Sequence, residues 1–241
     1  MVSTLGCPGI DGIQRWHDVG PVRVHASGLL MPALLVFAAG ALTWRPWAAH
    51  LLLLGAQAVH LLQPDAGQAT AVACGASALV WAAPHQRNKA LLLSLYAISG
   101  ALPWFRRDDL PPVPFVEDIV VQAFALAPAV GALALVSLAL FVLAPLLGVR
   151  SKQFPLGAAL AIAGYFAGSL VAPRFGEFPV PLLGFGTSPT LGAFLALAML
   201  RRLRLAEPDT RALASAGPSA SKDDERYLLG KLELSRFGVQ R

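Results

Sequence analysis

Charged residues are scarce in this chain, and their scarcity excludes an ordinary soluble domain. Lysine, arginine, aspartate and glutamate make up 14% of the 241 residues, whereas roughly 25% is typical of soluble domains. Hydrophobic residues make up 56%, and the mean hydropathy is +0.60. The composition therefore predicts a polytopic membrane protein of the all-α class, with the lipid bilayer as its solvent, and we expect it in a cell inner membrane of bacterial type.

Motifs for several chemistries are also missing. The chain has no HExxH zinc motif, no GxxxxGK[ST] phosphate loop and no GxSxG nucleophile elbow. Its net charge of +5 is spread over short loops and the C-terminal stretch, so it offers no continuous basic face to nucleic acid. Cys7 lies in a polar segment and Cys74 in an apolar one, which predicts no disulfide. We expect a non-enzymatic role without a cofactor or metal, but the absence of these motifs does not exclude an intramembrane enzyme.

Seven apolar stretches follow one another, separated by prolines and basic residues. Most approach the lower end of the roughly 17–25 residues that cross a bilayer as a helix. Gly164 and Gly168 in the sixth have GxxxG spacing, which allows two helices to approach closely. A shorter interfacial helix is expected before the fifth, ending near Pro128. We expect a transmembrane bundle at 24–204 with spans at 24–44, 47–63, 66–83, 90–104, 128–147, 154–172 and from 189 to the arginines at 201 and 202.

Polar segments flank the predicted bundle. Residues 1–23 predict an outer-face N-terminal tail with one surface helix around 13–19. Residues 205–241 predict a cytoplasmic tail, in which a disordered linker precedes a short amphipathic helix at 223–237. That helix is either the solvated end of a tail or a docking element for the membrane surface or a protein partner.

Basic residues in the loops predict which end of the bundle faces the cytoplasm. With seven spans, one set of loops holds eight basic residues and no acid, and the other holds five basic residues together with every acid of residues 1–200. Cytoplasmic loops are enriched in basic residues, so we expect the N-terminus outside and the C-terminus inside. The inner set consists of Arg45, Arg87, Lys89, Arg150, Lys152, Arg201, Arg202 and Arg204.

The segment between the sixth and seventh spans is the leading candidate for a binding site. It combines Arg174 and Glu177 with prolines and glycines that prevent regular helix, and Ser188 then begins the last helix. A helix N-terminus beside an arginine favours anions, and Gly184 and Gly186 let a ligand approach the backbone. We expect Arg174 and Ser188 to hold an anionic group in an outer-face cavity. The alternative is an ordinary loop with an Arg–Glu surface pair.

His50 and His60 in the second span are a weaker candidate. Neutral imidazole at membrane depth binds haem iron, as in haem b proteins. Ten residues of helix, however, separate the two rings by about 80° around the axis and about 15 Å along it. One helix therefore cannot supply both ligands to one iron, and we favour histidines that make hydrogen bonds inside the bundle.

Two pairs of adjacent acids, Asp108-Asp109 and Glu117-Asp118, are a third candidate. Adjacent carboxylates point to different sides of a helix, and acids near a helix start stabilise it through the helix dipole. We therefore favour a structural role over proton handling, which would need a carboxylate at bilayer depth.

One stretch carries a local resemblance. Residues 179–200, PVPLLGFGTSPTLGAFLALAML, contain a P-x-P sequence, a glycine-containing turn and a final apolar helix. In these features the stretch resembles the end of the SEDS glycosyltransferases of cell-wall synthesis, whose turn is of the Ser-Tyr-Gly-Gly-Ser-Ser type. Gly184 and Thr187 stand where that family has serine and glycine. No residue here matches the catalytic outer-loop aspartate of that family. The resemblance implies that this chain enters its last helix through a similar turn.

The expected function is that of a non-enzymatic transport component or a subunit of a membrane complex, with an outer-face cavity formed by residues 174–188. Two alternatives stay open. One is an intramembrane redox or haem-binding subunit. The other is an enzyme acting on lipid-linked substrates at the outer face, in which Glu117, Asp118 and Arg174 would act jointly.

Overall fold

The computed structural model describes residues 1–205, apart from residues 8, 11, 85, 109, 112, 114, 152 and 185. The predicted amphipathic helix at 223–237 lies outside the described residues. Helices dominate the part of the chain that is described, which confirms the all-α class. The helices are α1 (Ala26–Ala41), α2 (Pro46–Leu62), α3 (Ala66–Ala82), α4 (Lys89–Ala101), α5 (Ile119–Leu126), α6 (Pro128–Arg150), α7 (Leu156–Val171) and α8 (Thr187–Leu205), with 3-10 turns η1 (Val2–Gly6), η2 (Leu102–Phe105) and η3 (Ala172–Arg174).

Local sequence explains where three of these helices begin. Pro46 and Pro128 occupy the first positions of α2 and α6, where a missing N–H is tolerated and the fixed φ is already helical. The Asp65 carboxylate caps α3 by accepting a hydrogen bond from the backbone N–H of Gln68 at 3.1 Å. Each of the seven stretches predicted as spans contains one helix, and α5 is the short helix predicted before Pro128.

The N-terminal segment differs from the prediction. The surface helix expected around 13–19 is wrong, because β1 (Trp16–Val19) pairs with β2 (Val22–His25) as an antiparallel hairpin. Valines alternate with polar residues in β2, a pattern typical of strands. Gly20 in the two-residue turn has a φ of +60°, which glycine adopts without strain. The hairpin also takes the first two residues of the expected 24–44 span, so that helix starts only at Ala26.

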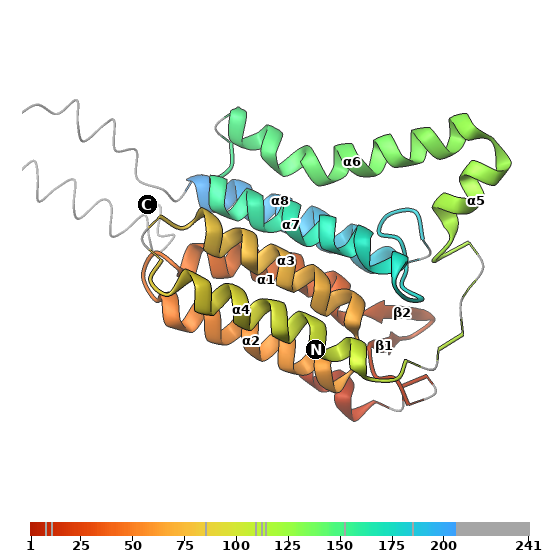
Figure 1. Ribbon diagram of the computed structural model, residues 1–241, viewed down its shortest axis with the longest axis horizontal. Helices are drawn as coiled ribbons and strands as arrows, with labels where there is room; N and C mark the ends of the chain where they lie inside the picture. The colour runs from red at the N-terminus through yellow and green to blue at the C-terminus, as the bar shows by residue number, and fades with distance from the viewer. Residues whose placement is uncertain are drawn as a thin grey trace, which may run out of the picture.

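The long helices lie side by side, and α3 occupies the middle of the bundle (Figure 1). It packs against α7 on one side and α4 on the other, while α1 packs against α8. Two glycines of α7 make the α3–α7 contact close: a Cβ on Gly164 would lie 2.9 Å from the Cys74 carbonyl oxygen, and one on Gly168 would lie 2.9 Å from the Ala71 Cα. The close approach predicted from the GxxxG spacing is therefore confirmed.

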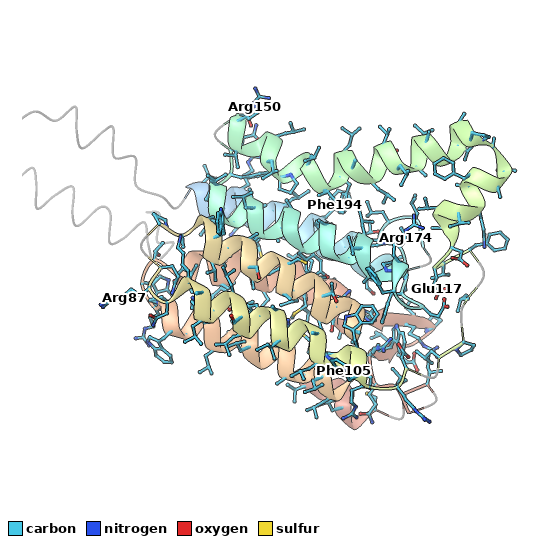
Figure 2. All side chains as sticks on the ribbon, viewed as in Figure 1. Arg87, Phe105, Glu117, Arg150, Arg174 and Phe194 are labelled. Atoms are coloured by element: carbon cyan, nitrogen blue, oxygen red, sulfur yellow. The ribbon has the colours of Figure 1, made fainter. Side chains whose placement is uncertain are left out.

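Charged side chains gather at the two ends of the bundle. Figure 2 shows Arg87 and Arg150 at one end and Glu117 and Arg174 at the other. We call the first the basic end, because its described charged residues are all cations: Arg45, Arg87, Lys89, Arg150, Arg201 and Arg202. The other, which we call the mixed end, holds Arg15, Asp18, Arg23, Asp65, Arg106, Arg107, Asp108, Glu117, Asp118, Arg174 and Glu177. Between the ends, the described helices carry no acidic, lysine or arginine side chain.

Two of the described helical segments are long and apolar enough to cross a membrane. They are α6, with a mean hydropathy of 2.6 over its most apolar stretch, and α7 with its η3 extension, with 1.6. Helices α1 to α4 are apolar but shorter, and the seven-span arrangement therefore stays a prediction. Only 17% of the apolar stretch of α6 is buried. Of these two segments, the one with the higher mean hydropathy is thus also the less buried.

Candidate functional site

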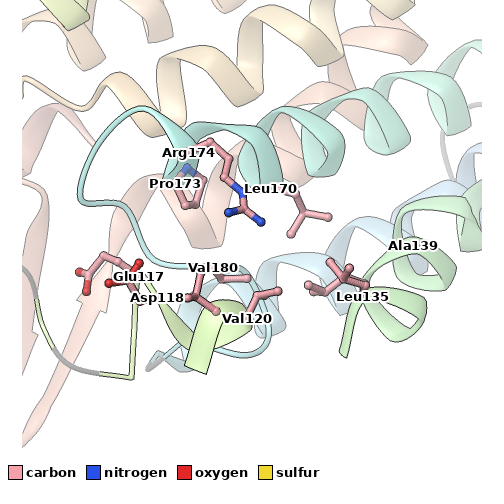
Figure 3. A pocket seen from close by; sticks show the side chains of 11 residues that line it. Glu117, Asp118, Val120, Leu135, Ala139, Leu170, Pro173, Arg174 and Val180 are labelled. Carbon is pink, nitrogen blue, oxygen red and sulfur yellow. The ribbon is translucent and has the colours of Figure 1, made fainter. Parts of the chain in front are cut away.

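Arg174 lines a pocket at the mixed end, at the junction of α5, α6 and the end of α7. The cavity has a volume of about 250 Å³. Its polar residues are Arg174, which ends η3, and the adjacent acids Glu117 and Asp118, which precede α5. Its other walls are apolar. In Figure 3, Glu117 and Asp118 lie together at one side of the pocket, Leu135 and Ala139 lie at the other, and Arg174 reaches in from the end of α7.

The charged groups of this pocket are largely free of partners within the described chain. Arg174 is exposed and forms no ion pair with a described carboxylate within 4.0 Å. The Asp118 side chain makes no capping hydrogen bond to α5. One oxygen of Glu117 accepts a hydrogen bond from the backbone N–H of Val113 at 2.9 Å. The pocket rim therefore presents one cation and two carboxylates to a ligand.

Arg174 and the Glu117-Asp118 pair were separate candidates in the sequence, combined only in the alternative of an enzyme acting on lipid-linked substrates, and in the structure they line one pocket. The chain reverses at Ala127, whose extended backbone (φ −163°, ψ 137°) separates α5 from α6. That reversal lays α6 beside α7 and brings the residues before α5 next to the end of α7. The break near Pro128 was the only sequence signal for this arrangement, and it does not by itself specify which helix α6 packs against.

The remaining residues of the predicted 174–188 cavity lie elsewhere. Glu177 is exposed and does not line the pocket. The Gly184 N–H donates to the Val180 carbonyl at 2.7 Å, and Gly186 has a φ of +146°, so the two glycines shape the loop. Ser188 is buried, and its hydroxyl accepts a hydrogen bond from the His25 N–H at 2.9 Å. Ser188 thus joins α8 to the hairpin and does not face Arg174.

A second polar group at the mixed end, which we call the Arg15 cluster, consists of Arg15, His25, Asp65 and Asp108. Arg15 is only 4% exposed and pairs with the Asp108 carboxylate at 2.6 Å. Its guanidinium also donates to the carbonyl oxygens of Gln63 and Pro64 in the α2–α3 turn. The His25 Nε2 lies 3.3 Å from Asp65 Oδ2. The cluster ties the hairpin, the α2–α3 turn and the loop after η2 together.

The electrostatics of the cluster favour ionised Asp65. Burial alone would raise the pKa of this carboxyl, but the Arg15 charge and the contact with His25 outweigh burial and hold the pKa well below its usual range. Asp65 is therefore a buried anion whose charge is balanced by its neighbours. Sequence reasoning missed the cluster, and the available signal was Asp65 directly before α3, in the position of a helix cap.

The two histidines of α2 face different neighbours. His60 is fully buried, with its Nδ1 3.2 Å from the Gln57 side-chain oxygen and its Nε2 3.2 Å from the Ser27 hydroxyl on α1. His50 contacts the Tyr96 hydroxyl on α4 through its Nδ1 at 2.9 Å, and its Nε2 has no hydrogen-bond partner. Both ring nitrogens of His60 are engaged, so these residues do not fit a pair of ligands to one haem iron.

Metal ligation has no further support in the part of the chain that is described. No three described His, Cys, Asp or Glu side chains are placed to hold a metal ion. Asp108 is engaged with Arg15, and Asp109 lies outside the described residues. The Arg174 pocket and the Arg15 cluster each bring charged side chains from separate parts of the chain together at the mixed end.

Comparison with family models, with curated proteins and with solved structures found no match for this chain.

Proposed function

We propose that this chain is an integral membrane protein of the cell inner membrane, acting as a non-enzymatic component of a transport system or a membrane complex, with a ligand pocket beside Arg174 on its outer face. The observation that carries this proposal is the apolar surface between the two charged ends. A soluble protein with such a surface would aggregate, because large contiguous apolar patches are rarely left in water. Lipid is the solvent that this surface fits.

The exposed side of α6 is the clearest part of that surface. Leu133 on this helix is 67% exposed, and Leu140 is 57% exposed. Burial of such side chains against lipid tails is favourable by roughly 25 cal/mol for each Å² removed from water. Tryptophans mark one border of the apolar zone: Trp44, Trp47 and Trp81 all lie exposed near the basic end. Tryptophan is enriched at the membrane–water interface.

Helix dimensions and loop charges are compatible with this orientation. Helices α1, α2 and α3 have 16 or 17 residues, which at 1.5 Å per residue gives about 24–26 Å, slightly less than a bilayer core of roughly 30 Å. The basic end would face the cytoplasm, since basic loops are retained there. The Arg174 pocket would then open at the outer face.

Labelling of single cysteines tests the proposal. Ser151→Cys reports on the basic end and Glu177→Cys on the mixed end, both in a background with Cys7 and Cys74 replaced by serine. We expect a membrane-impermeant maleimide to label Glu177→Cys in intact spheroplasts and Ser151→Cys only after permeabilisation. Equal labelling of both positions in intact spheroplasts, or recovery of the chain in the soluble fraction, would contradict the proposal.

A second candidate is an enzyme acting on lipid-linked substrates at the outer face. The observation favouring it is that Glu117, Asp118 and Arg174 line one pocket. A carboxylate can serve as general acid or base, while an arginine binds a phosphate group. The two candidates separate by substitution: Glu117→Gln with Asp118→Asn abolishes turnover if the pocket is catalytic. If the pocket only binds a ligand, neither the parent protein nor the double variant yields a product.

A further inference from the structure

We propose that the Arg174 pocket holds a phospholipid of the outer leaflet whose headgroup carries a primary amine, with its phosphate on Arg174 and its ammonium on Glu117 and Asp118. This inference rests on the membrane placement proposed above and names the ligand of that pocket. It follows from the charge, the depth and the access of the cavity.

The charges of the pocket match a zwitterionic headgroup. Arg174 has no described carboxylate within 4.0 Å, so its guanidinium is available to bind phosphate oxygens. Glu117 and Asp118 lie at one side of the pocket, away from the apolar wall formed by Leu135 and Ala139. A primary ammonium donates three hydrogen bonds to such carboxylates, whereas a quaternary ammonium donates none. An anionic headgroup without an amine would leave both carboxylates unpaired beside its own charge.

The pocket extends from headgroup depth into the apolar zone. Arg174 and Asp118 stand at the ends of their helices, at the border of the bundle. Leu135 and Ala139 lie seven and eleven residues beyond the start of α6 at Pro128, which corresponds to about 10–16 Å along the helix. A ligand that fills the whole cavity must therefore be polar at one end and apolar at the other.

Helix α6 contacts its neighbours at two places, and the stretch between these contacts is accessible from the membrane. Near its start, Gly131 faces the Phe124 ring of α5, since a Cβ there would lie 2.2 Å from that ring. Further along, Phe141 packs on Phe166 of α7 with ring centroids 4.3 Å apart. Leu135 lies between these contacts, lines the pocket and is still 45% exposed. A lipid can enter from the side without unfolding any helix.

The volume of the cavity agrees with partial enclosure of a lipid. At about 250 Å³, it is smaller than the roughly 300–1,000 Å³ of cavities that enclose a drug-sized ligand. It has room for a headgroup and the first part of one chain. The rest of the lipid would stay in the bilayer beside α6, whose outer side is exposed and apolar.

Titration of the full-length protein in detergent with short-chain phospholipids tests this inference. Binding of dioctanoyl phosphatidylethanolamine, phosphatidylcholine and phosphatidylglycerol is measured by native mass spectrometry. We expect the ethanolamine lipid to bind at least about tenfold more tightly than the other two. Arg174→Ala should weaken its binding about tenfold or more. Glu117→Gln with Asp118→Asn should remove the preference over phosphatidylcholine while the phosphate contact remains.

Matched variants control for charge and for folding. Arg106→Ala removes an exposed arginine of the same end, and Glu177→Gln removes an acid three residues from Arg174 that does not line the pocket. Neither should change the affinity. Circular dichroism of each variant verifies that it has folded. If Arg174→Ala has not folded, Arg174→Lys takes its place. This substitution keeps the charge but loses the bidentate contact with phosphate, so the lipid should bind severalfold more weakly.

Three outcomes would overturn the inference. The first is equal affinity for the three lipids, and the second is an Arg174→Ala variant that binds as the parent does. The third is binding of free phosphoethanolamine as tight as that of the lipid, because the apolar wall would then have no role. If the cysteine labelling succeeds and lipid selectivity is absent, only this inference fails. If the labelling gives the contradicting result, the proposed membrane placement and this inference both fail.

Discussion

Arg15 and Asp108 are 93 residues apart in the sequence, and their side chains form an ion pair at 2.6 Å. The pair joins the residue before the hairpin to the loop after η2, and it lies over the α2–α3 turn. Both partners are largely removed from solvent, with 4% and 22% of their side chains exposed. The N-terminal segment is therefore fastened to the bundle by a largely buried charge pair.

Removing Arg15 should destabilise the protein strongly. Arg15→Met leaves Asp108 and Asp65 with one fewer buried cation, and breaking a buried pair in this way costs roughly 3–5 kcal/mol. The measurement is denaturant unfolding in detergent, with Arg106→Ala as an exposed control that should change stability by less than about 0.5 kcal/mol. In an Arg15→Met, Asp108→Asn double variant the losses should not add. Additive losses would show that the two side chains act independently.

Acid should weaken the fold through Asp65. Because its folded-state pKa lies below the 3.8 of an unperturbed carboxyl, ionised Asp65 stabilises the fold at pH values above about 4. This contribution is lost as the pH falls through the folded-state value. Asp65→Asn should therefore be less stable than the parent at pH 7. Unfolding measured between pH 2 and pH 8 should show a smaller loss of stability in acid for Asp65→Asn than for the parent, and equal losses would contradict this role.

Small residues at the α3–α7 contact should not tolerate a methyl group. A Cβ on Gly168 would lie 2.9 Å from the Ala71 Cα, and that backbone cannot move away cheaply. Gly168→Ala should lose roughly 1–3 kcal/mol of stability through overpacking. Gly157→Ala, on the same helix, is the matched control, because its Cβ would meet only side chains at 3.8 Å or more. Equal stability of the two variants would show that α3 and α7 are packed less closely.

The two native cysteines report on the solvent around the bundle. Cys74 is exposed on α3 and Cys7 is half-buried at the mixed end. If lipid surrounds the helices, a membrane-impermeant maleimide should label Cys7 and leave Cys74 unlabelled until denaturant is added. Cys7→Ser should then show no labelling in intact membranes. Rapid labelling of Cys74 in the native protein would mean that water covers α3.

The helices were predictable because their signals are local. Pro46 and Pro128 begin α2 and α6, Asp65 caps α3, and Arg150 lies in the last turn of α6, so these boundaries can be seen within a few residues. The hairpin was missed because residues 13–19 were considered without β2. Its valines and the Gly20-Pro21 turn were the informative signals, and they lie outside that window.

The candidate sites were less predictable, because they depend on contacts between distant segments. Arg174 lines a pocket at the mixed end, but the sequence around it gives no information about which residues before α5 lie beside it. Ser188 looked like a free helix start, and only the position of β2 shows that His25 uses its hydroxyl. The Arg15 cluster assembles residues from four parts of the chain, none of which forms a motif with its sequence neighbours.

The hydrogen bond between His25 and Ser188 has a mechanical consequence. Helix α8 starts at this bond and runs the height of the bundle to the basic end. It packs chiefly along α1, the helix that β2 itself leads into. The hairpin and these two helices thus form one connected unit, so a displacement of the hairpin at the mixed end would move α8 as well.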